Sequence, residues 1–189
     1  MNTPGIDDSF PPLPAPEFSH MIARRPLPAA PVTLVPDEQQ RAALARRFGL
    51  SAIRQMQAVI SLDADGDTII ARGSLAADIE QPCAISGEDF STHIEEPLYL
   101  RFVPVNTICQ AGEEEIELGA EDCDEIPYSG DQFDLGEAIA QSLFLAIDPY
   151  AKGPDADMAR KESGLMDENA SGPFAALAAL RGQMDKKGN

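Results

Sequence analysis

The chain has 189 residues, 43% of them hydrophobic and 24% charged, so it is long enough to form one domain with a buried core. Its 14 basic and 32 acidic residues give a formal net charge of −18, which argues against whole-surface binding to bare nucleic acid or anionic lipid. A basic protein is electrostatically the easier partner.

The N-terminal third predicts an arm, an edge strand and one helix. Residues 1–17 are acidic and rich in proline, which is typical of a flexible arm. Residues 18–34 carry scattered prolines and are compatible with an edge strand but not a central one. Asp37 and Gln40 then form a capping-box pattern that predicts a helix over residues 37–48.

The next fifty residues predict an antiparallel meander. From Ile53 apolar and polar residues alternate, Asp65 and Gly66 mark a tight hairpin, and a second connection lies near Gly87. The three long segments up to Phe102 present one apolar face, so we expect one covered face.

The remaining segments predict a loop, two helices and a linker. Residues 104–131 contain many acids and no basic residue, which indicates a solvated acidic loop. A second capping-box pattern opens a helix over residues 134–147, whose apolar stripe recurs every four residues. Residues 151–172 are expected to be a linker, and 173–189 a short helix with a tail. The expected buried stripe of the long helix is Leu135, Ile139, Leu143 and Ile147, widened by Phe144.

These elements predict the α+β fold class. We expect an antiparallel β-sheet, a meander of about four to six strands, packed by two or three helices within a domain spanning residues 18–150. Three cysteines without close pairing, and no signal peptide or membrane-length apolar stretch, predict a bacterial-type cytoplasmic protein. The oligomeric state stays open, as does whether the last helix docks on its own chain or on a partner.

Two groups of charged residues are candidate contact sites. Six arginines and two acids between residues 20 and 54 give a local charge of +4, although ordinary solvated arginines are the more common explanation. The candidate phosphate or RNA contacts are Arg24, Arg25, Arg41, Arg46, Arg47 and Arg54. The candidate contacts with a basic partner are Glu113, Glu114, Glu115 and Glu117.

No catalytic residue, cofactor, metal site or small-molecule substrate is predicted. The acidic run Asp63-Ala-Asp65-Gly-Asp67 lacks the later ligands of a calcium loop and fits a hairpin better. His93 occupies a strand position that is expected to face solvent, and general-base work is the less favoured interpretation.

Three stretches together resemble one family. The helix sequence QRAALARRFGL precedes a strand pair leading to Gln81-Pro82-Cys83, then DLGEAIAQSLFLAIDPY at residues 134–150 and PFAALAAL at 173–180. In this order they resemble the YceD-like large ribosomal RNA subunit accumulation proteins, in their alphaproteobacterial form. Some members carry a Cys-x-x-Cys pair and further cysteines that look zinc-binding. Here Ser86 takes the place of the second cysteine, so we expect no zinc.

The resemblance implies a cytoplasmic factor in 23S ribosomal RNA accumulation or processing and in large-subunit biogenesis. We expect a non-enzyme that contacts a basic protein of assembly or RNA processing, with any RNA contact restricted to the region from Arg24 to Arg54. One alternative is a metal-dependent RNA hydrolase or nuclease that uses the clustered carboxylates of residues 113–125. Another is a direct RNA-binding module that uses the arginines between Arg24 and Arg54.

Overall fold

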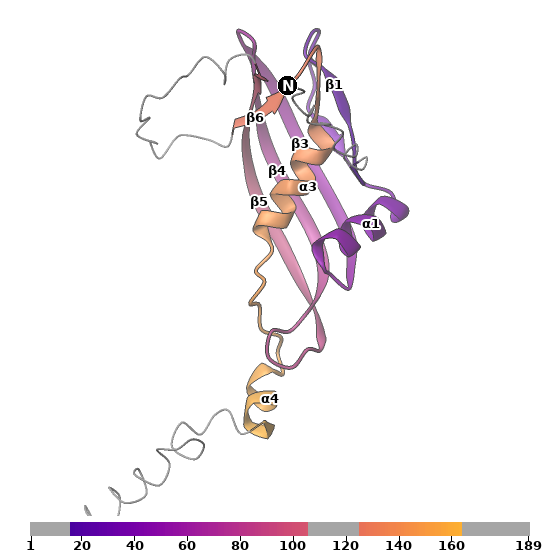
Figure 1. Ribbon diagram of the computed structural model, residues 1–189, viewed down its shortest axis with the longest axis vertical. Coiled ribbons are helices and arrows are strands. Elements are labelled where there is room, and N and C mark those ends of the chain that lie inside the picture. The colour runs from indigo at the N-terminus through magenta and orange to yellow at the C-terminus, as the bar shows by residue number, and fades with distance from the viewer. Residues whose placement is uncertain (1–15, 106–124, 164–189) are drawn as a thin grey trace, which may run out of the picture.

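The computed structural model describes residues 16–105 and 125–163 and has an α+β architecture (Figure 1). A long, twisted sheet forms one layer, and two helices lie across one of its faces (Figure 1). The predicted fold class is confirmed.

The main sheet has the strand order β2-β3-β4-β5-β6, and three long antiparallel strands form most of it. These strands are β3 (Ala52–Asp65), β4 (Thr68–Pro82) and β5 (Asp89–Pro104). At the β3–β4 hairpin Asp65 pairs with Thr68, and Gly66 has a φ of 64°, a left-handed conformation that suits glycine. The predicted meander and its first hairpin are therefore confirmed.

Period-two alternation places one face of each long strand in the core. Ile60 of β3, Leu75 and Ile79 of β4 and Phe102 of β5 are each 1% exposed or less. Their neighbours along each strand point to the opposite, polar face, where Arg72 packs on the ring of Tyr99. Among residues 16–105 and 125–163, the sheet is thus covered on one face only, as predicted.

In the part of the chain that the structure describes, four short strands complete the two sheets. Strand β2 lies at the edge of the main sheet, as the prolines before it predict, and β1 pairs with β7 in a separate two-stranded sheet. The bounds are Met21–Ala23 for β1, Val32–Leu34 for β2, Glu125–Tyr128 for β6 and Gln132–Asp134 for β7.

Strand β6 corrects the prediction that residues 104–131 form a loop. It pairs with β5 in parallel, from Arg101 with Glu125 to Pro104 with Tyr128. Tyr128 is 5% exposed and packs near Phe133. The acidic composition obscured two apolar side chains at period two, Ile126 and Tyr128, that anchor this strand in the core.

Helix α1 (Glu38–Phe48) has both hydrogen bonds of the predicted capping box and ends at Gly49, which has a φ of 71°.

Helix α3 (Leu135–Ala146) buries Leu135, Ile139 and Leu143 against the sheet, as predicted. Ile147 caps the helix and is only partly buried, and Phe144 is 53% exposed, so their expected burial is wrong. The helix ends one residue early and leaves this last turn at the margin of the core.

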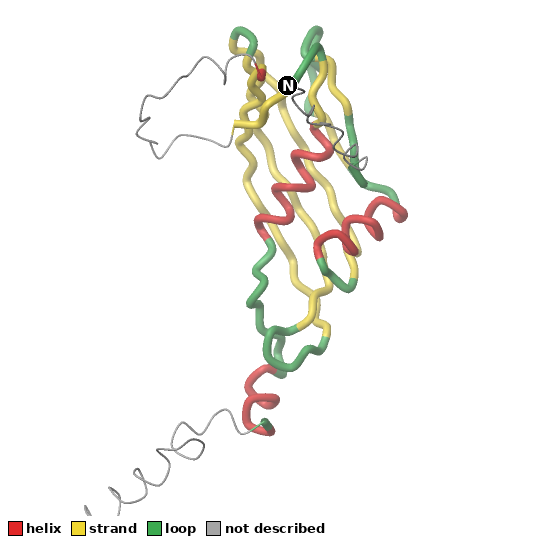
Figure 2. Tube along the Cα trace, in the orientation of Figure 1, coloured by secondary structure: helices red, strands yellow, loops and turns green. Residues whose placement is uncertain are grey.

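Helix α4 (Ala156–Glu162) lies within the segment expected to be a linker, beyond the end of the sheet (Figure 2). Its apolar content is small, which explains why the periodicity did not reveal it. No helix in residues 16–105 and 125–163 has the length and hydropathy needed to cross a membrane.

Candidate functional site

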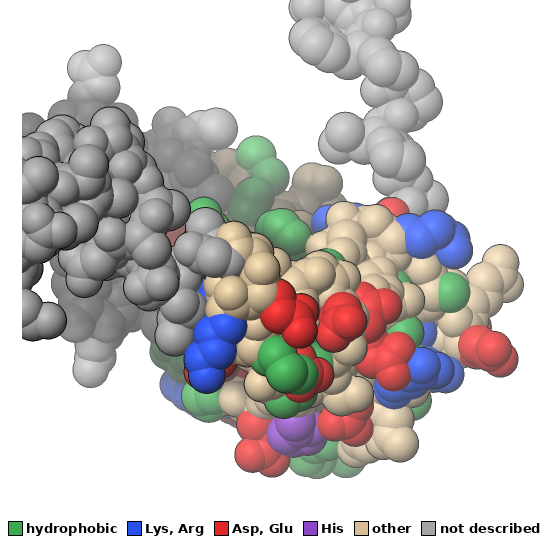
Figure 3. All heavy atoms as spheres, turned by 90° about the horizontal axis from the view of Figure 1, so that it is seen from below, with side chains coloured by type: hydrophobic (Ala, Val, Ile, Leu, Met, Phe, Trp, Pro, Cys, Tyr) green, Lys and Arg blue, Asp and Glu red, His purple; other side chains and the backbone are tan. Residues whose placement is uncertain are grey.

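The fold divides the six candidate arginines into two groups. Arg24 and Arg25 follow β1 and meet the tip of the β3–β4 hairpin. The other four lie on helix α1 and at the beginning of β3. The arginines therefore do not form one continuous basic surface. On the end of the molecule seen in Figure 3, basic side chains lie singly among acidic ones.

The hairpin group is neutralised by nearby acids. The Arg24 guanidinium lies 3.3 Å from the Asp67 carboxylate and donates a hydrogen bond of 3.4 Å to the Tyr128 hydroxyl. This hydrogen bond is the largest cause that raises the pKa of Arg24. Arg25 donates to the carbonyl of Gly66 and also meets Asp67, at 3.4 Å. Both side chains fasten the hairpin tip to β1.

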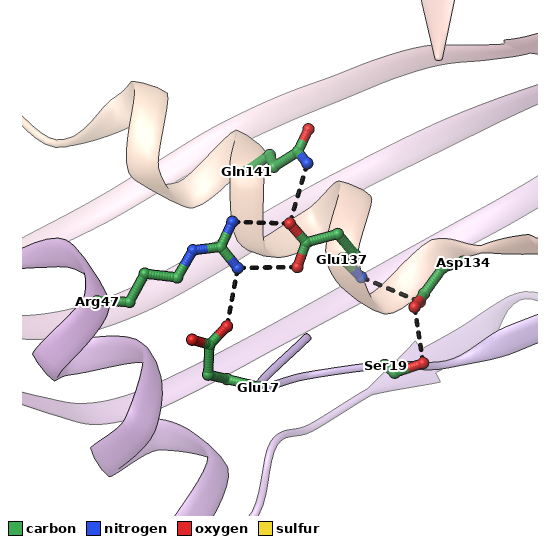
Figure 4. Close-up of polar contacts among 6 residues, drawn as sticks. All are labelled: Glu17, Ser19, Arg47, Asp134, Glu137 and Gln141. Atoms are coloured by element: carbon green, nitrogen blue, oxygen red, sulfur yellow. Dashed lines mark hydrogen bonds and ion pairs between the residues drawn. The ribbon is translucent and has the colours of Figure 1, made fainter. Parts of the chain in front are cut away.

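Arg47 joins three segments that are far apart in sequence (Figure 4). Its guanidinium donates two hydrogen bonds to the Glu137 carboxylate on α3, at 2.7 and 2.9 Å, and one of 2.9 Å to Glu17. The bidentate contact raises the pKa of Arg47 and lowers the pKa of Glu137. Arg47 therefore connects α1 to α3 and to the segment before β1.

The beginning of α3 explains the Asp-Leu-Gly-Glu sequence at residues 134–137. The Asp134 carboxylate caps the helix by accepting from the Glu137 amide at 3.1 Å, and it also accepts from the Ser19 hydroxyl and the His20 amide. A Cβ on Gly136 would lie 2.6 Å from the backbone nitrogen of His20, so only glycine allows this close approach. The Glu137 carboxylate binds Arg47 rather than the Asp134 amide, which differs from the capping box expected there.

Two of the remaining three arginines bind groups of the same chain. Arg54 makes a bidentate pair with Glu80, at 2.7 and 2.8 Å, and Arg41 donates to the carbonyl of Pro36. Arg46 is exposed and forms no ion pair with residues 16–105 or 125–163. Among the six candidates, Arg46 is the side chain most available to an external group.

An open hollow of about 340 Å³ is formed by residues of β3, β4 and β5 together with Val35 and one side chain of α1. Arg41, Arg54, Asp78 and His93 line it. The hollow is shallow and mixed in charge, and it supplies no enclosed, apolar space of the kind that ligand pockets provide.

The pair of His93 and Asp78 gives a testable pH effect. His93 is exposed, as predicted, and its Nδ1 lies 2.6 Å from an Asp78 oxygen, a hydrogen bond that raises the pKa of His93. Because the folded-state pKa is raised, the pair stabilises the fold below the unfolded pKa, and this contribution is lost as the pH rises through the folded pKa. Histidine resonances followed by NMR should show a pKa for His93 above about 6.5, returning toward it in Asp78→Asn. An unchanged His93 titration in that variant would contradict the pairing.

Cys83 lies in a tight turn after β4. Its side chain is 3% exposed, and its Sγ accepts hydrogen bonds from the amides of Ile85 and Ser86, at 3.4 and 3.5 Å. Contacts with Ser86 are the main cause that lowers the pKa of the thiol, to about 6. The Ala84 amide donates to the carbonyl of Ala151, which fastens this turn to the segment before α4.

The candidate carboxylate contacts remain predictions. Glu113, Glu114, Glu115 and Glu117 lie outside the described residues, as does most of the 113–125 cluster and the expected helix at 173–180. Within residues 16–105 and 125–163, no three His, Cys, Asp or Glu side chains gather in a way that would hold a metal ion.

The sequence did not reveal Glu17 and Glu137 as partners of Arg47. They are 30 and 90 residues away along the chain, and no local spacing signals such a contact. In the sequence, Glu137 fits only the expected capping box at the beginning of the helix.

One comparison with known proteins gives a match. The family model described as "Large ribosomal RNA subunit accumulation protein YceD" matches residues 71–181, which include most of β4 and all of β5 and α3. Neither the search of curated proteins nor the search of solved structures found a match.

Proposed function

Because the chain belongs to the YceD family of large ribosomal RNA subunit accumulation proteins, we propose that it supports 23S ribosomal RNA accumulation and large-subunit biogenesis. The family match over residues 71–181 is the observation that carries this proposal. The protein acts without catalysing a reaction, by contacting a basic protein of assembly or RNA processing.

The state of the arginines supports a protein contact over a direct RNA contact. Arg24, Arg25, Arg47 and Arg54 are each held by acids of the same chain, so phosphate would have to compete with existing partners. Binding to RNA depends mainly on cations that are free to neutralise phosphates. With a net charge of −18, the chain attracts a basic protein instead.

Affinity capture of the full chain from cells tests this proposal. At low salt the chain should retain a basic protein of the large subunit or of its RNA processing, and ribonuclease treatment should leave that protein bound. Loss of the protein after ribonuclease would show that RNA carries the contact, and would overturn the proposed mechanism.

The salt dependence of the captured pair is a further expected result. Opposite charges mainly raise the association rate, and salt screens them over about 10 Å at 0.1 M, so association should slow steeply with salt while dissociation changes less. The combined variant Glu113→Gln, Glu114→Gln, Glu115→Gln and Glu117→Gln should reproduce the effect of high salt. Stopped-flow or surface binding kinetics measures both rates. Equal salt dependence in the variant and the parent would remove these glutamates from the contact.

The nuclease alternative predicts a different result. Incubation with precursor ribosomal RNA and magnesium or manganese would cleave the RNA, and the same glutamine variant would abolish the cleavage. We expect no metal-dependent cleavage by the purified chain.

A further inference from the structure

An apolar groove lies beside the last turn of α3. It has a volume of about 410 Å³, and apolar side chains line most of it. We call it the α3 groove; its walls include Phe48, Leu50, Pro82, Phe144, Ile147 and Pro149. The groove thus lies where the end of α1, the end of β4 and the end of α3 meet.

The apolar side chains of this groove are not fully covered by the described part of the chain. Phe144 is 53% exposed and Leu145 is 74% exposed, although Leu143, directly before them in α3, is fully buried. One face of the Phe144 ring packs against Phe48, with ring centroids 5.3 Å apart. Contiguous exposed apolar surface of this kind marks a contact site more often than a single exposed side chain does.

We propose that the α3 groove is the docking site of the chain's own C-terminal segment, residues 173–180. This segment reads PFAALAAL, in which Phe174, Leu177 and Leu180 recur at helical spacing and alanines fill the other positions. An apolar stripe on a short helix suits a groove of this shape, and the alanines allow the two backbones to approach closely. The family match extends to residue 181 and so includes the segment.

The length of chain allows the segment to return. Pro149 lies in the groove wall, and the six residues to Asp155 span at most about 20 Å. Helix α4 adds 7 residues, or about 10 Å, and residues 164–172 can extend to about 30 Å. The nine-residue connection is therefore long enough to bring Phe174 back to the groove.

Charge and tethering favour this occupant over a second copy of the chain. The whole chain has a net charge of −18, so two copies repel each other, although Arg46 and Arg47 lie in the last turn of α1 next to the groove. Residues 181–187 carry Arg181, Lys186 and Lys187 against one acid, Asp185. A short tether also holds the segment at an effective concentration on the order of 1 mM, above that of any second copy.

A single tryptophan reports on the groove, because the natural chain contains none. In the full chain carrying Phe144→Trp, the indole should be shielded by the segment and emit at shorter wavelength. Adding Phe174→Ala, Leu177→Ala and Leu180→Ala should shift the emission to longer wavelength and increase quenching by acrylamide. The matched control, Leu165→Ala with Met166→Ala in the preceding connection, should leave both readings unchanged.

A second reporter and a peptide keep the test decisive. Leu145→Trp, at the most exposed of these positions, should respond in the same way if Phe144→Trp does not fold. A synthetic peptide of residues 170–184 should reverse the shift in the triple-alanine variant and have no effect on the intact chain. If the emission wavelength of a folded tryptophan variant stayed the same after the triple-alanine change, the proposal would be overturned. Shielding that rises with protein concentration, with dimers in sedimentation, would also overturn it in favour of a second copy.

Discussion

Alanine in place of Gly73 should destabilise the fold by about 3 kcal/mol or more, at or beyond the upper end for overpacking substitutions. Gly73 lies in the middle of β4, paired with Ile60 on one side and with Leu98 on the other. A Cβ built there would lie 1.9 Å from the carbonyl oxygen of Val59 and 2.9 Å from the Ile60 side chain. The neighbouring strand would have to move, and the paired backbone of the main sheet resists that movement.

The expected change is opposite in sign to that of an ordinary glycine-to-alanine substitution in a strand. A glycine within a strand is ordinarily a weak point, so replacement by alanine would normally stabilise the strand. Urea unfolding of Gly73→Ala measures the change, and Ser74→Ala, at the exposed next position, is the matched control, with a change within about 0.5 kcal/mol. A loss below about 0.5 kcal/mol for Gly73→Ala would show that the strands are not so close.

Leu143→Ala should cost about 2–5 kcal/mol, the range for removing a large side chain from a packed core. Leu143 is 0% exposed on the face of α3 that covers the sheet, whereas Leu145, two residues later, is 74% exposed. Leu145→Ala is therefore the control and should change the free energy of unfolding far less. Equal effects of the two substitutions would mean that α3 presents a different face to the sheet.

Local signals were sufficient for much of this fold. The capping box at Asp37, the hairpin at Gly66 and the apolar stripe through Leu143 each depend on residues close in sequence, and the structure has all three. Period-two alternation likewise predicted which side of each long strand lies in the core.

Contacts between distant residues were not predictable in the same way. The parallel pairing of β6 with β5 joins Glu125 to Arg101 across the acidic segment, and nothing in that segment indicates it. Arg47 is a second example. In the sequence it is one of six arginines that are candidate phosphate contacts, but in the fold it binds Glu17 and Glu137. Charge counted along the sequence does not show which charges already have partners in the fold.

This pairing changes how the arginines should be tested. Substitution of Arg47 would remove a link between α1 and α3, so a loss of function would not distinguish RNA binding from weakened packing. Arg46, on the same helix and exposed, is the better choice.

The ratio of large-subunit to small-subunit ribosomal RNA in cells that lack the protein is the most direct test of the proposed function. We expect the ratio to fall, and we expect the parent chain and Arg46→Gln both to restore it. The combined glutamine variant at Glu113, Glu114, Glu115 and Glu117 should restore it poorly. An unchanged ratio in cells without the protein would contradict the function itself. Full restoration by the glutamine variant, together with failure of Arg46→Gln, would contradict the protein contact and indicate direct RNA binding.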